Sequence, residues 1–126
     1  MTQPFVRGLA VILAAVLVGG CATPNGSAPG KDIPTASDQT EASRRAATRL
    51  ELASAYFASG QYATALDEVK QTIALQPNNF EAYNLRGLIY AAMGDDGMAD
   101  ESFRYALQLN PRSADVMQNY GWFQCL

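Results

Sequence analysis

From about residue 46 onward the sequence repeats itself with a period of 34 residues. The recurring positions are Tyr56, Gly60, Ala65, Leu75 and Pro77, which return as Tyr90, Gly94, Ala99, Leu109 and Pro111. A fixed period of this length is typical of stacked supersecondary units, each of which buries its apolar face against a neighbour. The repeat therefore restricts the fold to an array of like units before any local propensity is considered.

Each period divides into two helical segments. Residues 47–60 and 82–94 carry apolar side chains at helical spacing and stop at a glycine, which can adopt the left-handed conformation that closes a helix. Residues 61–77 and 95–111 repeat the pattern and stop at a proline, which cannot continue a helix. Capping-box spacing marks helix starts at Asp38 with Glu41 and at Asn78 with Glu81. The sequence predicts an all-α fold of antiparallel helix hairpins.

A period of 34 with small, aromatic and proline residues at these offsets resembles the tetratricopeptide repeat. The resemblance implies a repeat region over residues 38–126, with units at about 44–77 and 78–111 and a partial unit at 112–126. It implies that alanines lie where the two helices of a hairpin cross and that larger side chains fill the space between hairpins. The alanines are Ala65 and Ala99, and the larger side chains are Tyr56, Val69, Tyr90 and Phe103.

Three residues depart from the pattern of that family. Arg49 stands in place of a large aromatic residue, Arg86 in place of leucine and Asp96 in place of tyrosine. We expect looser packing in the first unit and an altered turn at Gly94. The last unit supplies a first helix without a second, so we expect the sequence to end inside a helix and to be the front part of a longer protein. A C-terminus that packs on itself is the alternative.

In tetratricopeptide repeats the first helices of successive units line a concave groove. The positions carried over to this chain are Leu50, Ser54, Phe57, Glu81, Asn84, Leu88, Ala91, Asp115, Gln118 and Trp122, together with the alanines Ala47, Ala58 and Ala92. None is Lys or Arg, which disfavours capture of a peptide C-terminal carboxylate. An apolar floor beside an amide and two acids suits an extended or helical peptide segment. The alternative is that these side chains only cover the scaffold.

The composition leaves few candidates for catalysis or metal binding. The chain has no histidine, its only cysteines are Cys21 and Cys125, and its net charge is −3 with no basic stripe. Nucleic acid is therefore not expected as a partner, nor is a small-molecule substrate, a cofactor or a metal. The acids between Asp95 and Glu101 lack the ligand spacing of a calcium loop and suit a solvated turn and helix start. We expect a binding protein and not an enzyme.

The first twenty residues have the order of an export signal. Arg7 precedes an apolar run from Leu9 to Val18, which is about half the roughly 20 residues needed to cross a bilayer. The run ends in "VGGC", which resembles the bacterial lipobox and implies cleavage before Cys21 and lipidation of its sulfur. The alternatives are an ordinary signal cut after Ala22 and an uncleaved anchor.

The segment that follows is expected to be a disordered tether. Residues 21–37 are rich in Pro, Gly, Ser and Thr and carry few large apolar side chains that could offset the cost of ordering the chain. In Gram-negative lipoproteins a residue other than Asp after the lipidated cysteine favours the outer membrane, and here that residue is Ala22. The resemblance therefore implies a lipid-anchored outer-membrane protein that faces the periplasm.

The segments "EAYNLRGLIYAAMGD" and "NYGWFQC" are similar to those of the PilF/PilW group of type IV pilus biogenesis lipoproteins, the pilotins. That resemblance implies a scaffold that binds the pilus secretin and helps it to reach, and to assemble in, the outer membrane. Two alternatives stay open. One is another outer-membrane scaffold, for β-barrel assembly or peptidoglycan synthase activation, and the other is the non-catalytic front part of an enzyme.

Cys125 would be the only thiol left after lipidation of Cys21, in an oxidising compartment. We expect it to form a disulfide with a cysteine of a later repeat. A small buried side chain that never oxidises is the alternative.

Lipidation is tested by metabolic labelling with palmitate. The wild-type protein should be labelled and should be found in the membrane fraction. Cys21→Ser should not be labelled, because no other residue in "VGGC" has a thiol. Persistent labelling of the variant would contradict the assignment.

Overall fold

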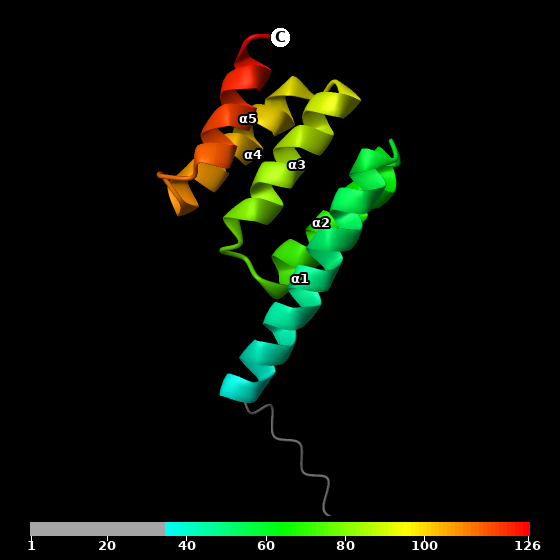
Figure 1. The fold of residues 1–126 in the computed structure, drawn as a ribbon, viewed down its shortest axis with the longest axis vertical. Helices are drawn as coiled ribbons and strands as arrows, with labels where there is room; N and C mark the ends of the chain where they lie inside the picture. The colour runs from blue at the N-terminus through cyan, green and yellow to red at the C-terminus, as the bar shows by residue number, and fades with distance from the viewer. Residues whose placement is uncertain (1–34) are drawn as a thin grey trace, which may run out of the picture. The chain divides into compact units, whose positions relative to one another are not determined.

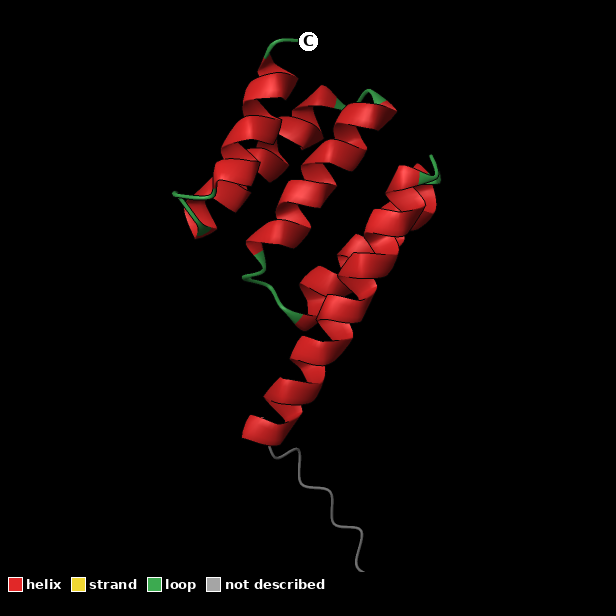
Figure 2. Cartoon of the chain, viewed as in Figure 1, coloured by secondary structure: helices red, strands yellow, loops and turns green. Residues whose placement is uncertain are grey.

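The computed structural model describes residues 35–126, which form five helices (Figure 1). They are α1 (Ala36–Ala58), α2 (Tyr62–Leu75), α3 (Phe80–Met93), α4 (Asp96–Leu109) and α5 (Ala114–Gln124). Every regular element within this range is a helix (Figure 2), which confirms the all-α prediction. None of these five helices is long and apolar enough to cross a membrane. The predicted signal, Cys21 and most of the predicted tether lie outside the described residues.

The helices pair as two antiparallel hairpins, followed by one further helix. α1 packs on α2, α3 packs on α4, and α5 lies against both α3 and α4 (Figure 1). The starts of α2 and α4 are 34 residues apart, and so are those of α3 and α5. The structural period therefore equals the sequence period, as expected for stacked repeats.

The turns inside the two hairpins are alike. Gly60 and Gly94 have φ angles of 76° and 78°, in the left-handed region that glycine adopts without strain. The residue after each glycine donates its backbone N–H to a tyrosine carbonyl at 2.9 Å, from Gln61 to Tyr56 and from Asp95 to Tyr90. The turn at Gly94 is thus unaltered, in contrast to the expectation drawn from Asp96.

The helix boundaries differ in detail from the predicted ones. α1 is capped by Thr35, three residues before the predicted cap Asp38. The Thr35 hydroxyl accepts from the Asp38 N–H at 3.2 Å, and the Asp38 carboxylate accepts from the Thr35 N–H at 3.0 Å, which completes a capping box. α3 is capped by Asn79 and not by Asn78. Oδ1 of Asn79 accepts from the Ala82 N–H at 3.0 Å. Asn79 is the repeat equivalent of Ser113, the cap of α5. α5 ends at Gln124, two residues before the last residue of the sequence.

The core consists of two clusters of buried side chains, one for each hairpin and the helix that follows it. The alanines at the helix crossings, Ala65 and Ala99, are fully buried, as predicted. Val69 is fully buried beside residues of α3, and Phe103 lies at centroid distances of 5.5 Å from Tyr120 and 5.6 Å from Phe123 of α5. Both therefore fill the space between neighbouring units, as the repeat pattern implies.

Gly87 of α3 lies so close to the Phe103 ring of α4 that no side chain fits between them. A β-carbon added to Gly87 would lie 2.7 Å from that ring, well inside normal contact distance. The first hairpin has Ala53 and Val69 at the same two repeat positions. In the first hairpin the second helix thus carries the smaller Val69 in place of Phe103, and the first helix carries the larger Ala53 in place of Gly87. The two changes compensate in volume, which keeps both hairpins close-packed.

The two arginines that depart from the family pattern both link the helices of a hairpin. Arg49 on α1 pairs with Glu68 on α2 at 2.6 Å. Arg86 on α3 donates from Nε to the buried hydroxyl of Ser102 on α4 at 2.9 Å. Glu68 and Ser102 are repeat equivalents, so the same point on the second helix receives an arginine in both units. In the first unit an ion pair therefore takes the place of the aromatic residue that the family prefers at Arg49, and the looser packing expected there stays a prediction.

α5 is joined to the second hairpin by side-chain hydrogen bonds as well as by aromatic packing. The Tyr120 hydroxyl donates to Oδ1 of Asp100 at 2.5 Å. This hydrogen bond to Asp100 is the main cause that raises the pKa of Tyr120 above 10.0, with desolvation second. The raised pKa means that the neutral phenol is the form that the folded protein favours.

The contact at Gly87 yields a stability prediction with a control in the same chain. Gly87→Ala should lower the free energy of unfolding by about 1–3 kcal/mol, because the added methyl overpacks against Phe103. Gly121 is at the equivalent position of α5, and a β-carbon added there would have no atom within 4 Å. Gly121→Ala should therefore raise the free energy of unfolding by up to about 1 kcal/mol, because alanine has the higher helix propensity. Urea unfolding followed by circular dichroism compares the two. Equal stabilisation by both substitutions would mean that the close contact does not exist in solution.

The Tyr120 contact yields a prediction about alkaline pH. Because the pKa of Tyr120 is raised by folding, its contribution to stability is complete below pH 10 and is lost as the pH rises through the folded value. Trp122 is the only tryptophan and lies on the same helix, so its emission reports the docking of α5. Wild-type protein should show a larger emission change above pH 10 than Tyr120→Phe, because the other five tyrosines ionise in both proteins. The same change in both proteins would exclude Tyr120 as its source.

Candidate functional site: the face formed by the first helices

The residues predicted to line a groove lie on three helices that are neighbours in space. α1 carries Leu50, Ser54 and Phe57; α3 carries Glu81, Asn84, Leu88 and Ala91; α5 carries Asp115, Gln118 and Trp122. α1 contacts α3, and α3 contacts α5, so α3 is the middle helix of this face. The structure nevertheless gives the ten residues different surroundings on the two sides of α3.

Between α1 and the start of α3 the surface is hollowed. The hollow has a volume of about 500 Å³ and is lined by Ser43, Ala47, Leu50, Glu51, Ser54, Gln76, Asn79 and Glu81. Leu50, Ser54 and Glu81 of the predicted groove meet here, together with Ala47. We call this the α1–α3 hollow. Its size is that of a site for one or two side chains of a bound segment.

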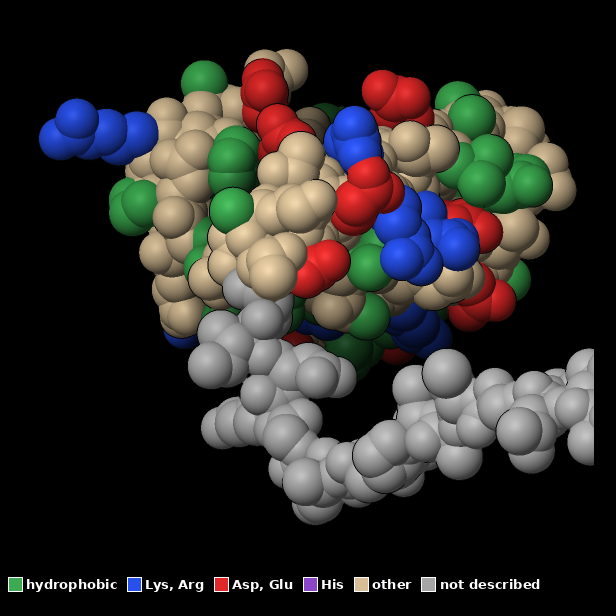
Figure 3. Space-filling view, turned by 90° about the horizontal axis from the view of Figure 1, so that it is seen from below, with side chains coloured by type: hydrophobic (Ala, Val, Ile, Leu, Met, Phe, Trp, Pro, Cys, Tyr) green, Lys and Arg blue, Asp and Glu red, His purple; other side chains and the backbone are tan. Residues whose placement is uncertain are grey.

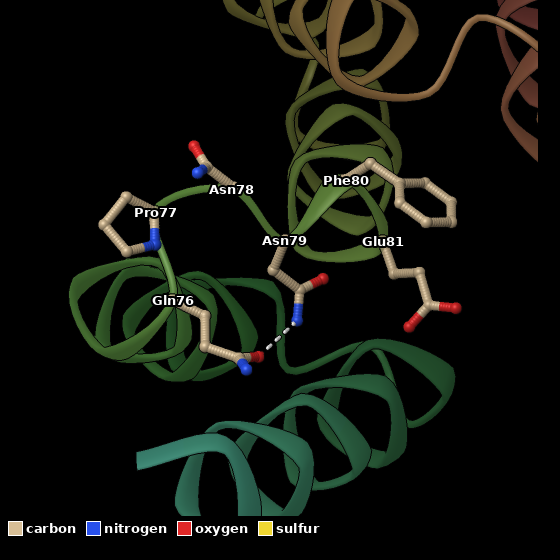
Figure 4. A pocket seen from close by; sticks show the side chains of 6 residues that line it. All are labelled: Gln76, Pro77, Asn78, Asn79, Phe80 and Glu81. Carbon is tan, nitrogen blue, oxygen red and sulfur yellow. Dashed lines mark hydrogen bonds between the residues drawn. The ribbon is translucent and has the colours of Figure 1, made fainter. Parts of the chain in front are cut away.

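The loop between α2 and α3 forms one wall of the α1–α3 hollow and is held by hydrogen bonds. Asn79 donates from Nδ2 to Oε1 of Gln76 at 3.1 Å (Figure 4), and Gln76 donates from Nε2 to the Ser43 hydroxyl at 2.8 Å. The chain of amides thus joins the cap of α3 to α1. Glu81, in the first turn of α3, extends from its helix toward α1 (Figure 4). A second hollow of about 490 Å³, lined by residues 76–81, adjoins the first through Gln76, Asn79 and Glu81.

On the other side of α3 the predicted groove residues take part in helix packing. Asn84 accepts from Nδ2 of Asn119 on α5 at 3.2 Å through its Oδ1. Leu88 packs partly against both core clusters, and Ala91 packs against the second. Asn84 and Leu88 therefore position α3 and α5, and substitutions there act on packing as well as on the surface. Phe57 packs partly against the first cluster.

The residues predicted on α5 are exposed. Asp115 and Gln118 lie at the surface, and the side chain of Trp122 is 57% exposed. Cys125 is a free, exposed thiol at the C-cap of α5. Its pairing with a later repeat stays a prediction.

Four residues of the α1–α3 hollow were not among the predicted groove residues. Ser43, Ala47 and Glu51 follow one another on α1 at four-residue spacing, and Ser54 comes three residues later on the same side of the helix. This helical spacing from the predicted residues Ala47 and Ser54 could have identified Ser43 and Glu51. Gln76 and Asn79 lie in a loop, where helical periodicity gives no guide to the direction of a side chain. Only the hydrogen bonds of the folded loop bring them to the hollow.

The arginines of α1 do not line the α1–α3 hollow. Arg44, Arg45, Thr48, Arg49 and Leu52 border a different hollow of about 400 Å³. Arg44 pairs with Glu41 and Arg49 with Glu68. Within the described part of the chain, neither Glu51 nor Glu81 forms an ion pair. The α1–α3 hollow therefore keeps an uncompensated negative charge.

The end of the structure at which α1 begins carries charges of both signs. Acidic and basic side chains lie directly beside one another over the middle of this face (Figure 3). Over residues 35–126 there is no group of three or more metal-ligating side chains. The hollow offers apolar contact, hydroxyls, amides and carboxylates, which can recognise a partner.

Comparison with known proteins agrees with the architecture. A model described as "TPR repeat" matches residues 53–94, and a model described as "Tetratricopeptide repeat" matches residues 80–113. The chain is also 28% identical over 118 residues to the type IV pilus assembly protein PilF of Pseudomonas aeruginosa. The match covers 94% of this chain and 44% of that protein, so the chain spans less than half the length of this relative. Residues 53–113 are therefore tetratricopeptide repeats, in an all-α helical-repeat chain that is similar in sequence to a type IV pilus assembly protein.

Proposed function

We propose that this protein is an outer-membrane-anchored scaffold of type IV pilus biogenesis that binds the pilus secretin and promotes its localisation and assembly in the outer membrane. The observation that carries the proposal is the α1–α3 hollow on a tetratricopeptide-repeat face, in a chain that is similar to PilF along nearly its whole length. Tetratricopeptide repeats imply protein–protein interaction, and the name of the relative supports a role in pilus assembly.

The proposed mechanism is binding without chemistry. A segment of the secretin occupies the face formed by α1 and α3, with an apolar side chain against Leu50 and Ala47. The wall residues Gln76 and Asn79 are already tied to α1, so little conformational entropy is lost when the segment binds. The lipid proposed at Cys21 then carries the bound pair to the outer membrane, where the secretin assembles.

The test uses a deletion strain complemented with variants of the chain's own gene. Deletion should remove surface pili and leave secretin monomers in place of detergent-resistant multimers. Ala47→Trp should fail to restore multimers, because the ring fills the α1–α3 hollow, whereas Ala63→Trp on the exposed face of α2 should restore them. Circular dichroism and immunoblotting show whether both variants fold and accumulate equally.

Two results would count against the proposal. Normal secretin multimers in the deletion strain would exclude a role in secretin assembly. A pull-down in mild detergent that returns a β-barrel assembly machine or a peptidoglycan synthase, and no secretin, would favour the alternative of a different outer-membrane scaffold.

A further inference from the structure

The α1–α3 hollow has a chemical bias that the repeat architecture does not require. Of its eight lining residues two are acids, Glu51 and Glu81, and none is Lys or Arg. Both glutamates are exposed, and neither has an ion-pair partner among residues 35–126. Three arginines of α1, Arg44, Arg45 and Arg49, line the separate hollow beside Leu52.

The other polar groups of the hollow are already engaged. Asn79 caps α3 with its Oδ1 and donates to Gln76, while Gln76 donates to Ser43. Ser54 donates to the Leu50 carbonyl at 2.9 Å. Unlike these groups, the two carboxylates have no hydrogen-bond or ion-pair partner in the described structure and can accept from a partner.

The apolar floor fixes the second property of the occupant. Leu50 is half-buried and Ala47 exposed, and both lie on the same stripe of α1 as Glu51. The aliphatic stem of an arginine or lysine can cover such a floor while its cationic end meets carboxylates at the rim. A carboxylate-bearing segment would meet only like charge here.

We propose that the α1–α3 hollow selects a peptide segment that carries an arginine or lysine next to an aliphatic or aromatic side chain, with the cation bound by Glu51 and Glu81. The inference rests on the proposed function, in that a peptide occupies this face, and adds the charge of that peptide. It assigns the carboxylates to partner recognition, where opposite charge chiefly raises specificity and the rate of association.

The test begins with a phage-displayed library of random nonapeptides selected on the immobilised full chain. Enriched peptides should contain Arg or Lys beside Leu, Ile, Val or Phe. One selected peptide is then synthesised with a fluorescent label, together with a copy in which citrulline or norleucine replaces the basic residue. Fluorescence anisotropy should show weaker binding of the neutral copy and weaker binding of the basic peptide at higher salt.

Matched variants locate the effect. Glu51→Gln combined with Glu81→Gln keeps the shape of both side chains and should weaken the basic peptide about five- to tenfold, the size expected for two partly exposed ion pairs. Asp67→Asn combined with Asp96→Asn removes the same charge from exposed positions on α2 and α4 and should change binding less than twofold.

Each other outcome overturns a defined part of the proposal. Enrichment of peptides without basic residues, or equal binding to the Glu51/Glu81 variant, would overturn the charge assignment and leave peptide binding intact. No enrichment over a blank surface, or equal binding to Ala47→Trp, would overturn both the inference and the hollow's role in the proposed function.

Discussion

The packing of the Phe103 ring against the backbone of α3 at Gly87 is the contact on which the rest of the structure depends. Because Gly87 has no side chain, the ring sits between α3 and α4 and still reaches the aromatic residues of α5. One fully buried side chain thereby joins three helices. The position of α3, the middle helix of the proposed binding face, follows from it.

Much of the fold could be predicted because the residues that recur every 34 positions have local structural roles that few other residue types can fill. A glycine at a left-handed turn, a proline after a helix and an alanine at a helix crossing each have few substitutes, so Gly60, Pro77 and Ala65 marked their positions reliably. Helix caps were predicted less well. Asn78 and Asn79 are chemically identical candidates, and only the register of the packed helix decides between them.

The site could be predicted only in part, for a related physical reason. Periodicity identifies the side of a helix that faces a given direction. It correctly placed Leu50, Ser54 and Glu81 on one surface, and in the structure these three residues line the same hollow. It carries no information on a loop wall such as Gln76, or on polar links between helices such as Arg49 with Glu68. Those depend on which side chains meet in three dimensions, which one sequence does not reveal.

Asn79 serves two structures at once, since it caps α3 and begins the chain of amides that ends at Ser43 on α1. The same side chain therefore lines the hollow and caps the first turn of α3. A segment that holds Asn79 and Gln76 in place also stabilises the first turn of α3, and in a repeat array each helix supports only its neighbours. Occupancy of the hollow, as proposed above, would therefore be thermodynamically linked to the stability of the array. A bound partner would hold the first two units together, so that binding and folding would share one free energy at this junction.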